Sequence, residues 1–213
     1  MADVVPDGEV KPRIAIVFYS TYGHVRTLAN SIRDSINDAG GEAVLLQVAE
    51  TLPDEVLAKM HAAPKDDSVA VATADDLPNY DGIIFGSPTR FGMMSAQMKT
   101  FMDTTGGLWA GGKLLGKPAG TFFATASLGS GQETTAFTWI TQLVHHGMIY
   151  VPMGYTNPAM FSLDEIHGGS PYGPGTYAAG DGSRQPTAIE LGICESYGKH
   201  FFGVVAALKK GRA

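Results

Sequence analysis

Residues 20–25, STYGHV, follow an apolar run and precede a helical pattern. A turn that opens a helix presents free backbone N–H groups at the positive end of the helix dipole, which favours an anion. Ser20 and Thr21 add hydroxyl donors, and Gly23 allows close backbone approach to a ligand. The stretch lacks the lysine of the GxxxxGK[ST] loop and lacks the GxGxxG fingerprint, so it predicts neutral donors for a single phosphate monoester. An ordinary helix N-cap is the alternative.

The loop GSPTRFGMMS, residues 86–95, offers the groups that a flat ligand needs along one side. Pro88 fixes the backbone after an apolar run, and Thr89 supplies a hydroxyl. Arg90 provides a forked donor or a flat face to stack on. Phe91 supplies an apolar wall, and Gly92 permits close approach. The alternative is a structured turn that caps the next helix, with Arg90 in a surface ion pair.

A third loop, TASLGSGQE at 125–133, consists mostly of small residues before another helical pattern. Such residues let a polar ring approach backbone N–H groups edge-on, although a glycine-rich turn before a helix has the same composition. One loop suited to phosphate and two suited to a flat heterocycle together indicate flavin mononucleotide (FMN) as the ligand.

The apolar runs supply the scaffold for these loops. Strands are expected at 13–20, 42–49, 80–88, 117–127 and 148–154, and helices at 26–40, 95–107, 133–147 and 187–211. Because five strands alternate with helices, the sequence predicts an α/β fold, a doubly wound five-stranded parallel sheet with helices on both faces. Open sheets of this kind bind ligands beyond the carboxyl ends of their strands, where all three loops fall.

Two stretches are less regular. Residues 53–63, PDEVLAKMHAA, suggest a short helix before a connecting loop that reaches residue 80. Residues 168–186 are dense in glycine and proline, and the length of this segment indicates that it is functional or mobile. Since no repeat or linker is evident, we expect a flexible lead-in over 1–12 and a single domain over 13–211.

The composition excludes several classes of protein. The net charge of −6 is unlike the basic face of nucleic-acid binders. No apolar run approaches the roughly 18 residues of a membrane span. Cys194 is the only cysteine, which excludes an internal disulfide and is typical of a reducing compartment. We therefore expect a cytoplasmic protein that binds neither nucleic acid nor membranes, and we predict no metal site.

Longer stretches of the chain resemble the WrbA-type NAD(P)H:quinone oxidoreductases, which are flavodoxin-like FMN enzymes. The resemblance rests on YSTYGHV, IIFGSPTRFGMMSAQMKTFMDTTGGLWA, HHGM, GGSPYG and AGDGSRQP, and it runs from about residue 13 to about residue 210. The lead-in and PDEVLAKM are similar to fungal members, including benzoquinone reductases. The resemblance implies a flavodoxin-like fold, FMN as cofactor, NADH or NADPH as electron donor and a quinone as substrate.

The resemblance also implies roles for individual residues. The FMN phosphate is expected at Ser20, Thr21, Gly23, His24 and Val25, and the isoalloxazine ring beside Pro88, Thr89, Arg90, Phe91 and Gly92. The ring edge and the ribityl chain are expected at Thr125, Ala126, Ser127, Leu128, Gly129 and Ser130. Bacterial relatives are more glycine-rich in this third loop, so the bulkier Leu128 is a departure from the pattern.

Three further residues are expected around the reactants. The resemblance implies that Tyr22 lies beside the nicotinamide, that His145 is the catalytic residue at the flavin, and that Trp109 lies on the substrate side. Without the resemblance, His145 is explained as a favourable charge at a helix end and Trp109 as packing.

The implied reaction is a ping-pong transfer of hydride from NAD(P)H through the flavin to the quinone, in two-electron steps. Trp109, Phe91 and Tyr22 would form an aromatic wall, and His145 would donate to the quinone oxygen. The family is tetrameric with sites where subunits meet, so a homotetramer is expected. The alternatives are a flavodoxin-type electron carrier, for which a charge of −6 is mild, and a scaffold that binds FMN without turnover.

Overall fold

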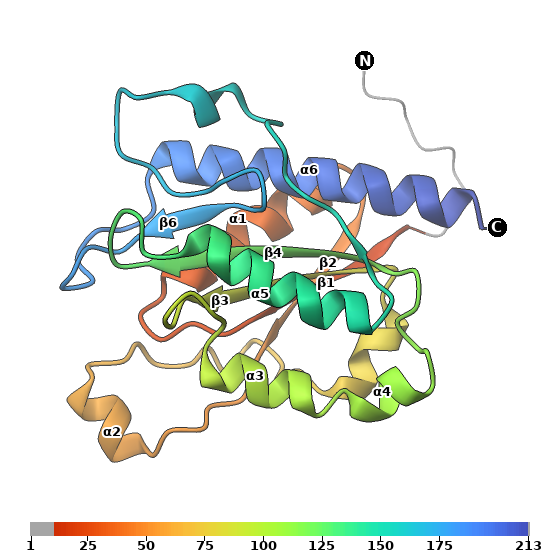
Figure 1. Ribbon diagram of the computed structural model, residues 1–213, viewed down its shortest axis with the longest axis horizontal. Coiled ribbons are helices and arrows are strands. Elements are labelled where there is room, and N and C mark those ends of the chain that lie inside the picture. Colours follow the sequence, from red (N-terminus) through yellow and green to blue (C-terminus); the bar gives the residue numbers. More distant parts are fainter. Residues whose placement is uncertain (1–10, 213) are drawn as a thin grey trace.

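A computed structural model describes residues 11–212 and shows a parallel sheet between two layers of helices (Figure 1). The strands lie in the order β2 (Glu42–Gln47), β1 (Arg13–Phe18), β3 (Gly82–Pro88), β4 (Pro118–Thr125) and β5 (Ile149–Tyr150), and every pair is parallel. This arrangement confirms the predicted doubly wound sheet. The predicted lead-in over 1–12 falls almost wholly outside the described residues and stays a prediction.

The strands are β1 (Arg13–Phe18), β2 (Glu42–Gln47), β3 (Gly82–Pro88), β4 (Pro118–Thr125), β5 (Ile149–Tyr150) and β6 (Gly175–Tyr177). The helices are α1 (His24–Asp38), α2 (Asp54–Lys59), α3 (Ala96–Asp103), α4 (Gly106–Ala110), α5 (Gln132–His145) and α6 (Ala188–Lys210). Two short 3₁₀ helices, η1 (Ala74–Asn79) and η2 (Pro158–Phe161), complete the described elements. None of these helices is long and apolar enough to cross a membrane.

The apolar run of β1 is explained by burial on both faces of the sheet. Ile14 and Ile16 pack in the layer that contains α1 and α6. Ala15 and Val17 pack in the opposite layer, which contains α3 and α5. Because successive side chains of a strand point to opposite faces, a strand covered on both sides must be apolar throughout.

The fifth strand differs from the prediction of one strand over 148–154. β5 has two residues and pairs with the beginning of β4, whereas β6 pairs with Phe123–Thr125 at the end of β4. Since β3 occupies the other edge of β4, β5 and β6 share one edge, and residues 151–174 are looped out between them. Glycine and proline around β6 hide its strand pattern in the sequence.

Two helix boundaries also differ from the prediction. The expected helix over 95–107 ends at Asp103, and a separate α4 begins at Gly106. The hydroxyls of Thr104 and Thr105 donate to backbone carbonyls three residues earlier, which competes with helical backbone bonding. The first helix begins at His24 rather than residue 26, directly after a left-handed Gly23.

Candidate functional site

A cleft of about 510 Å³ lies beyond the carboxyl ends of the parallel strands. Loops that follow β1, β3, β4 and β6 line it, together with the segment after α2. The lining residues are Ser20, Thr21, Tyr22, His24, Val25, Met60, His61, Ala63, Pro88, Thr89, Arg90, Ala124, Thr125, Ala126, Ala178, Ala179, Gly180, Asp181 and Gly182. The cleft has the size of a small-molecule site and lies where an open parallel sheet binds its ligands.

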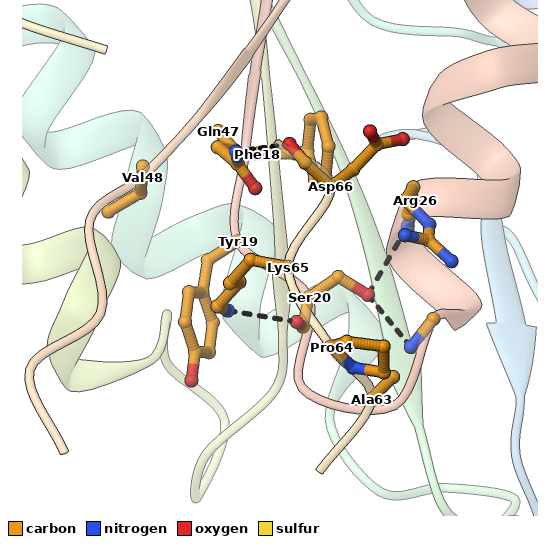
Figure 2. A pocket seen from close by; sticks show the side chains of 11 residues that line it. Phe18, Tyr19, Ser20, Arg26, Gln47, Val48, Ala63, Pro64, Lys65 and Asp66 are labelled. Atoms are coloured by element: carbon orange, nitrogen blue, oxygen red, sulfur yellow. Dashed lines mark hydrogen bonds between the residues drawn. The ribbon is translucent and has the colours of Figure 1, made fainter. Parts of the chain in front are cut away.

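The turn over residues 20–25 is held by the side chain of Ser20. Its hydroxyl oxygen accepts from the backbone N–H of Gly23 at 3.1 Å and of Arg26 at 3.4 Å (Figure 2). Gly23 has φ 94°, and a Cβ there would meet no heavy atom within 4 Å. The left-handed backbone, rather than crowding, therefore requires glycine at this position. Ser20 thus caps the helix and also lines the cleft.

The same turn leaves several backbone donors free. Within residues 11–212, no hydrogen bond involves the N–H groups of five residues of the turn: Ser20, Thr21, Tyr22, His24 and Val25. Three of these residues are almost fully buried, and Tyr22 is 45% exposed. Unpaired N–H groups in the first turn of a helix, at the positive end of its dipole, form a site for an anion.

The imidazole of His24 contacts the backbone of another segment of the cleft. Its Nε2 lies 2.8 Å from the carbonyl oxygen of Arg184, in the segment that follows β6. The Arg184 guanidinium lies 3.1 Å from both carboxylate oxygens of Glu190, which is fully buried in the first turn of α6. His24 therefore holds the cleft wall formed by residues 178–182. The sequence analysis indicated that residues 168–186 are functional or mobile, but it did not place residues 178–182 at the cleft, and it missed Met60 and His61.

The loop after β3 contacts the turn over residues 20–25, which we call the phosphate-type turn because its free N–H groups suit an anion. A guanidinium nitrogen of Arg90 donates to the hydroxyl of Thr21 at 3.3 Å, and the hydroxyl of Thr89 lies 3.0 Å from that of Thr135. In the described part of the chain Arg90 pairs with no carboxylate, so the alternative of a surface ion pair is not what the structure shows. Pro88, Thr89 and Arg90 all line the cleft.

The tip of this loop is a tight turn with a strained aromatic residue. Arg90 and Met93 exchange backbone hydrogen bonds of 2.8 and 3.0 Å. Phe91 and Gly92 between them have φ of 52° and 76°, and the Phe91 side chain is fully exposed. A left-handed conformation costs a non-glycine residue about 1–2 kcal/mol, so Phe91 is held against its own preference. Neither residue lines the cleft of the single chain.

Only the first two residues of the third predicted loop line the cleft. Thr125 and Ala126 line the cleft, and the Thr125 hydroxyl accepts from Gln132 at 3.1 Å. The remaining predicted residues, Ser127, Leu128, Gly129 and Ser130, are exposed and lie outside the cleft lining. Leu128 is 61% exposed.

A second hollow, of about 340 Å³, contains Trp109 and His145 together. α5 begins beside the cleft loops and runs back along β4, and its 14 residues span about 20 Å at the usual helical rise. His145 therefore lies at the amino-terminal edge of the sheet, opposite the cleft. Trp109, at the end of α4, is 59% exposed there. A single chain does not bring either residue to the cleft.

His146 is a buried residue in the lining of the second hollow. Its Nε2 lies 2.8 Å from the hydroxyl of Thr105, and the side chain is buried. Burial and the neighbouring His145 lower the pKa of His146. A neutral imidazole is thus favoured beneath the exposed Trp109 and His145. Elsewhere among residues 11–212, no group of three or more His, Cys, Asp or Glu side chains is placed to hold a metal ion.

Comparison with solved structures shows the fold. A flavodoxin, WrbA-like protein from Agrobacterium tumefaciens superposes with a TM-score of 0.65 at 22% identity, over 92% of this chain and 99% of that chain. Flavodoxin 1 from Bacillus cereus superposes with a TM-score of 0.57 at 18% identity, over 89% and 96%. These likenesses establish a flavodoxin-like fold.

Curated relatives are much more similar in sequence. The quinone oxidoreductase QR2 of Triphysaria versicolor is 57% identical over 203 residues, which cover 94% of this chain and 98% of that protein. The NAD(P)H quinone oxidoreductase YCP4 of Candida albicans is 51% identical over 201 residues, which cover 93% and 70%. The model of the NADPH-dependent FMN reductase family matches residues 12–160, and the chain belongs to that family.

Proposed function

We propose that the protein is an FMN-dependent NAD(P)H:quinone oxidoreductase. The observation that carries the proposal is the cleft with free backbone N–H groups at the start of α1. Two of its relatives are a quinone oxidoreductase and an NAD(P)H quinone oxidoreductase, which supports the same reaction.

The residues of the cleft fit FMN. The free N–H groups of the turn suit a terminal phosphate that is only anchored and never transferred, so no lysine is needed in the turn itself. Arg90 adds a positive charge beside Thr21, and the small residues Ala124, Thr125 and Ala126 leave room for a ring against the backbone. The segment 178–182 closes the cleft on another side.

When bound, FMN supplies the redox chemistry by accepting hydride from NAD(P)H and passing it to a quinone. The chain's own part is to bind and to orient. Tyr22, at the cleft and 45% exposed, offers a flat surface to a nicotinamide or a quinone. Phe91, in the loop after β3, is fully exposed and does not line the cleft of a single chain.

The two missing residues are proposed to come from another copy of the chain. Trp109 and His145 lie together on the opposite edge of the sheet, both exposed. A homotetramer that places this hollow over the cleft of a neighbouring subunit would complete the aromatic wall and supply a proton donor to the quinone oxygen. His145 is the catalytic residue in this proposal.

Stopped-flow mixing tests the proposal directly. Anaerobic NADH or NADPH should bleach the flavin absorbance of the purified holoprotein, and benzoquinone should then restore it. A shared site for donor and quinone predicts parallel lines in double-reciprocal plots, and intersecting lines would contradict it. A flavodoxin-type carrier, which the fold alone also allows, would show no bleaching by either nicotinamide.

A further inference from the structure

The phosphate-type turn receives a lysine from elsewhere in the chain. The ammonium group of Lys65 donates to the carbonyl oxygen of Ser20 at 3.2 Å (Figure 2). Two residues earlier, the backbone N–H of Ala63 donates to the carbonyl oxygen of Thr21 at 2.8 Å. The segment after α2 therefore holds two consecutive carbonyl groups of the turn.

Holding these carbonyls also fixes the direction of the N–H groups that a ligand would meet. In a trans peptide the C=O and the following N–H point in opposite directions, and no cis peptide occurs among the described residues. The Ser20 carbonyl directed at Lys65 turns the Thr21 N–H the other way, and the Thr21 carbonyl directed at Ala63 does the same for Tyr22. These are two of the five free donors of the turn.

Lys65 acts from behind the turn. It lines a small cavity of about 10 Å³ together with Gln47 and Asp66, as Figure 2 shows, and it is not among the described residues that line the cleft. Its ammonium group therefore does not face the ligand. The direct contact of Lys65 with the turn is its hydrogen bond to the Ser20 carbonyl, which connects it to the ligand through the peptide that follows.

Lys65 is itself fixed by a network of buried and half-buried groups. Its ammonium lies 3.2 Å from a carboxylate oxygen of Glu50 and 4.1 Å from the ring centre of Tyr19. The Tyr19 hydroxyl donates to the same carboxylate at 2.8 Å, and Gln97 donates to its other oxygen at 3.0 Å. The lysine is thus placed by contacts that do not involve the turn.

The charges in this network are stable at neutral pH. Burial acts to raise the pKa of Glu50, but hydrogen bonds from Tyr19, Thr51, Leu52 and Gln97 outweigh it and lower that pKa to about 2. Burial, with the bond to Glu50, raises the pKa of Tyr19 to about 12. At neutral pH Lys65 therefore faces a carboxylate and a neutral phenol.

We propose that Lys65 is a positioning residue for phosphate recognition, which orients the Thr21 N–H toward the FMN phosphate by holding the Ser20 carbonyl. The inference rests on the proposed function, since it takes FMN as the ligand of the turn. A charged hydrogen bond to this carbonyl also withdraws electron density from the peptide, which makes its N–H a better donor.

The test compares FMN with riboflavin, which lacks the phosphate. Lys65→Met should weaken FMN binding by about tenfold, the size of one lost charged hydrogen bond, and leave riboflavin binding unchanged. Lys65→Arg should restore most of the FMN affinity. Lys99→Met is the matched control, because Lys99 is an exposed lysine paired only with Asp103 along α3. Flavin fluorescence gives both affinities.

Hydrogen exchange of the apoprotein gives a second readout that needs no flavin. Lys65→Met should speed exchange in peptides that cover residues 20–25, and Lys99→Met should not. Equal loss of FMN and riboflavin affinity, unchanged FMN affinity, or unchanged exchange would each overturn the inference. A wild-type protein that binds no FMN would instead contradict the proposed function, while the exchange comparison would still decide the role of Lys65.

Discussion

The two hollows of the molecule are built in different ways. The cleft at the carboxyl edge of the sheet is assembled from separate segments, tied together by bonds such as those of His24 to Arg184 and of Arg90 to Thr21. The hollow at the amino edge lies between α3, α4 and α5 and presents Trp109 and His145 to solvent. One chain thus has a cleft that several segments enclose and, at the far edge of the sheet, a hollow whose aromatic and histidine side chains are exposed.

The sharpest way to break the cleft alone is Ser20→Glu. A carboxylate beside the free N–H groups repels a phosphate and competes for its donors, so FMN affinity should fall by at least about a hundredfold. Flavin content and FMN titration measure the effect, and circular dichroism checks that the apoprotein remains folded. Ser162→Glu adds the same charge in the looped segment 151–174, outside the cleft lining, and should change little. Normal FMN affinity of the Ser20 variant would show that the phosphate binds elsewhere.

The opposite hollow is tested by His145→Ala. Loss of a proton donor at the quinone should lower kcat by about a hundredfold while FMN affinity is unchanged. Co-expression of His145→Ala with Ser20→Glu should recover activity, because mixed oligomers then contain an intact cleft facing an intact histidine.

The control for that experiment is co-expression of His145→Ala with the double variant Ser20→Glu, His145→Ala, which offers no intact histidine. Mixed oligomers that stay inactive in both cases would contradict the proposal that one chain completes the cleft of another.

The network behind the cleft predicts a pH dependence. The pKa of Glu50 is about 2 in the fold against an ordinary value of 4.5, so its contribution to stability is complete above about pH 4.5 and is lost as the pH falls toward 2. Glu50→Gln should therefore flatten the decrease of Tm between pH 5 and pH 3, by a few degrees at most. A variant whose Tm falls as steeply as that of the wild type would show that other carboxylates dominate this range.

The smallest effect is expected for Phe91→Gly. The substitution relieves the left-handed strain at φ 52° and removes an exposed side chain, so Tm should stay within about two degrees despite the entropy cost of glycine. The kcat/KM for quinone should fall if Phe91 forms part of the reactant wall. Leu163→Gly, at a residue that is 98% exposed and has no positive φ, should be the more destabilising change.

Much of the scaffold was predictable because its signals are local. The continuous apolar runs of β1, β3 and β4 indicate strands that are buried on both faces of the sheet. Because these strands are parallel, the loops that follow their carboxyl ends lie at one edge of the sheet. β6 was missed because Gly175 follows Pro174 and the strand owes its existence to pairing with β4, which no short window of sequence contains.

The site was predictable only in part for a related reason. Ser20 and Arg90 belong to loops that are recognisable in the sequence, because an apolar strand precedes each loop and a helical pattern follows it. Met60 and residues 178–182 reach the cleft through the tertiary fold; the composition of 168–186 marked that segment as functional or mobile but did not show where it lies. His145 and Trp109 came from resemblance alone, and the fold of one chain explains their pairing with each other but not with the cleft.

The order in which the chain is synthesised bears on the cleft. Its phosphate turn is complete near the beginning of the sequence, but its last wall follows β6 and is held by Arg184 against Glu190 in the final helix. A growing chain emerges from its amino end, and contacts between distant segments form last. The cleft is therefore incomplete, with the donors of the turn exposed to water, until the segment after β6 and α6 have left the ribosome. We expect cofactor loading to follow the docking of α6.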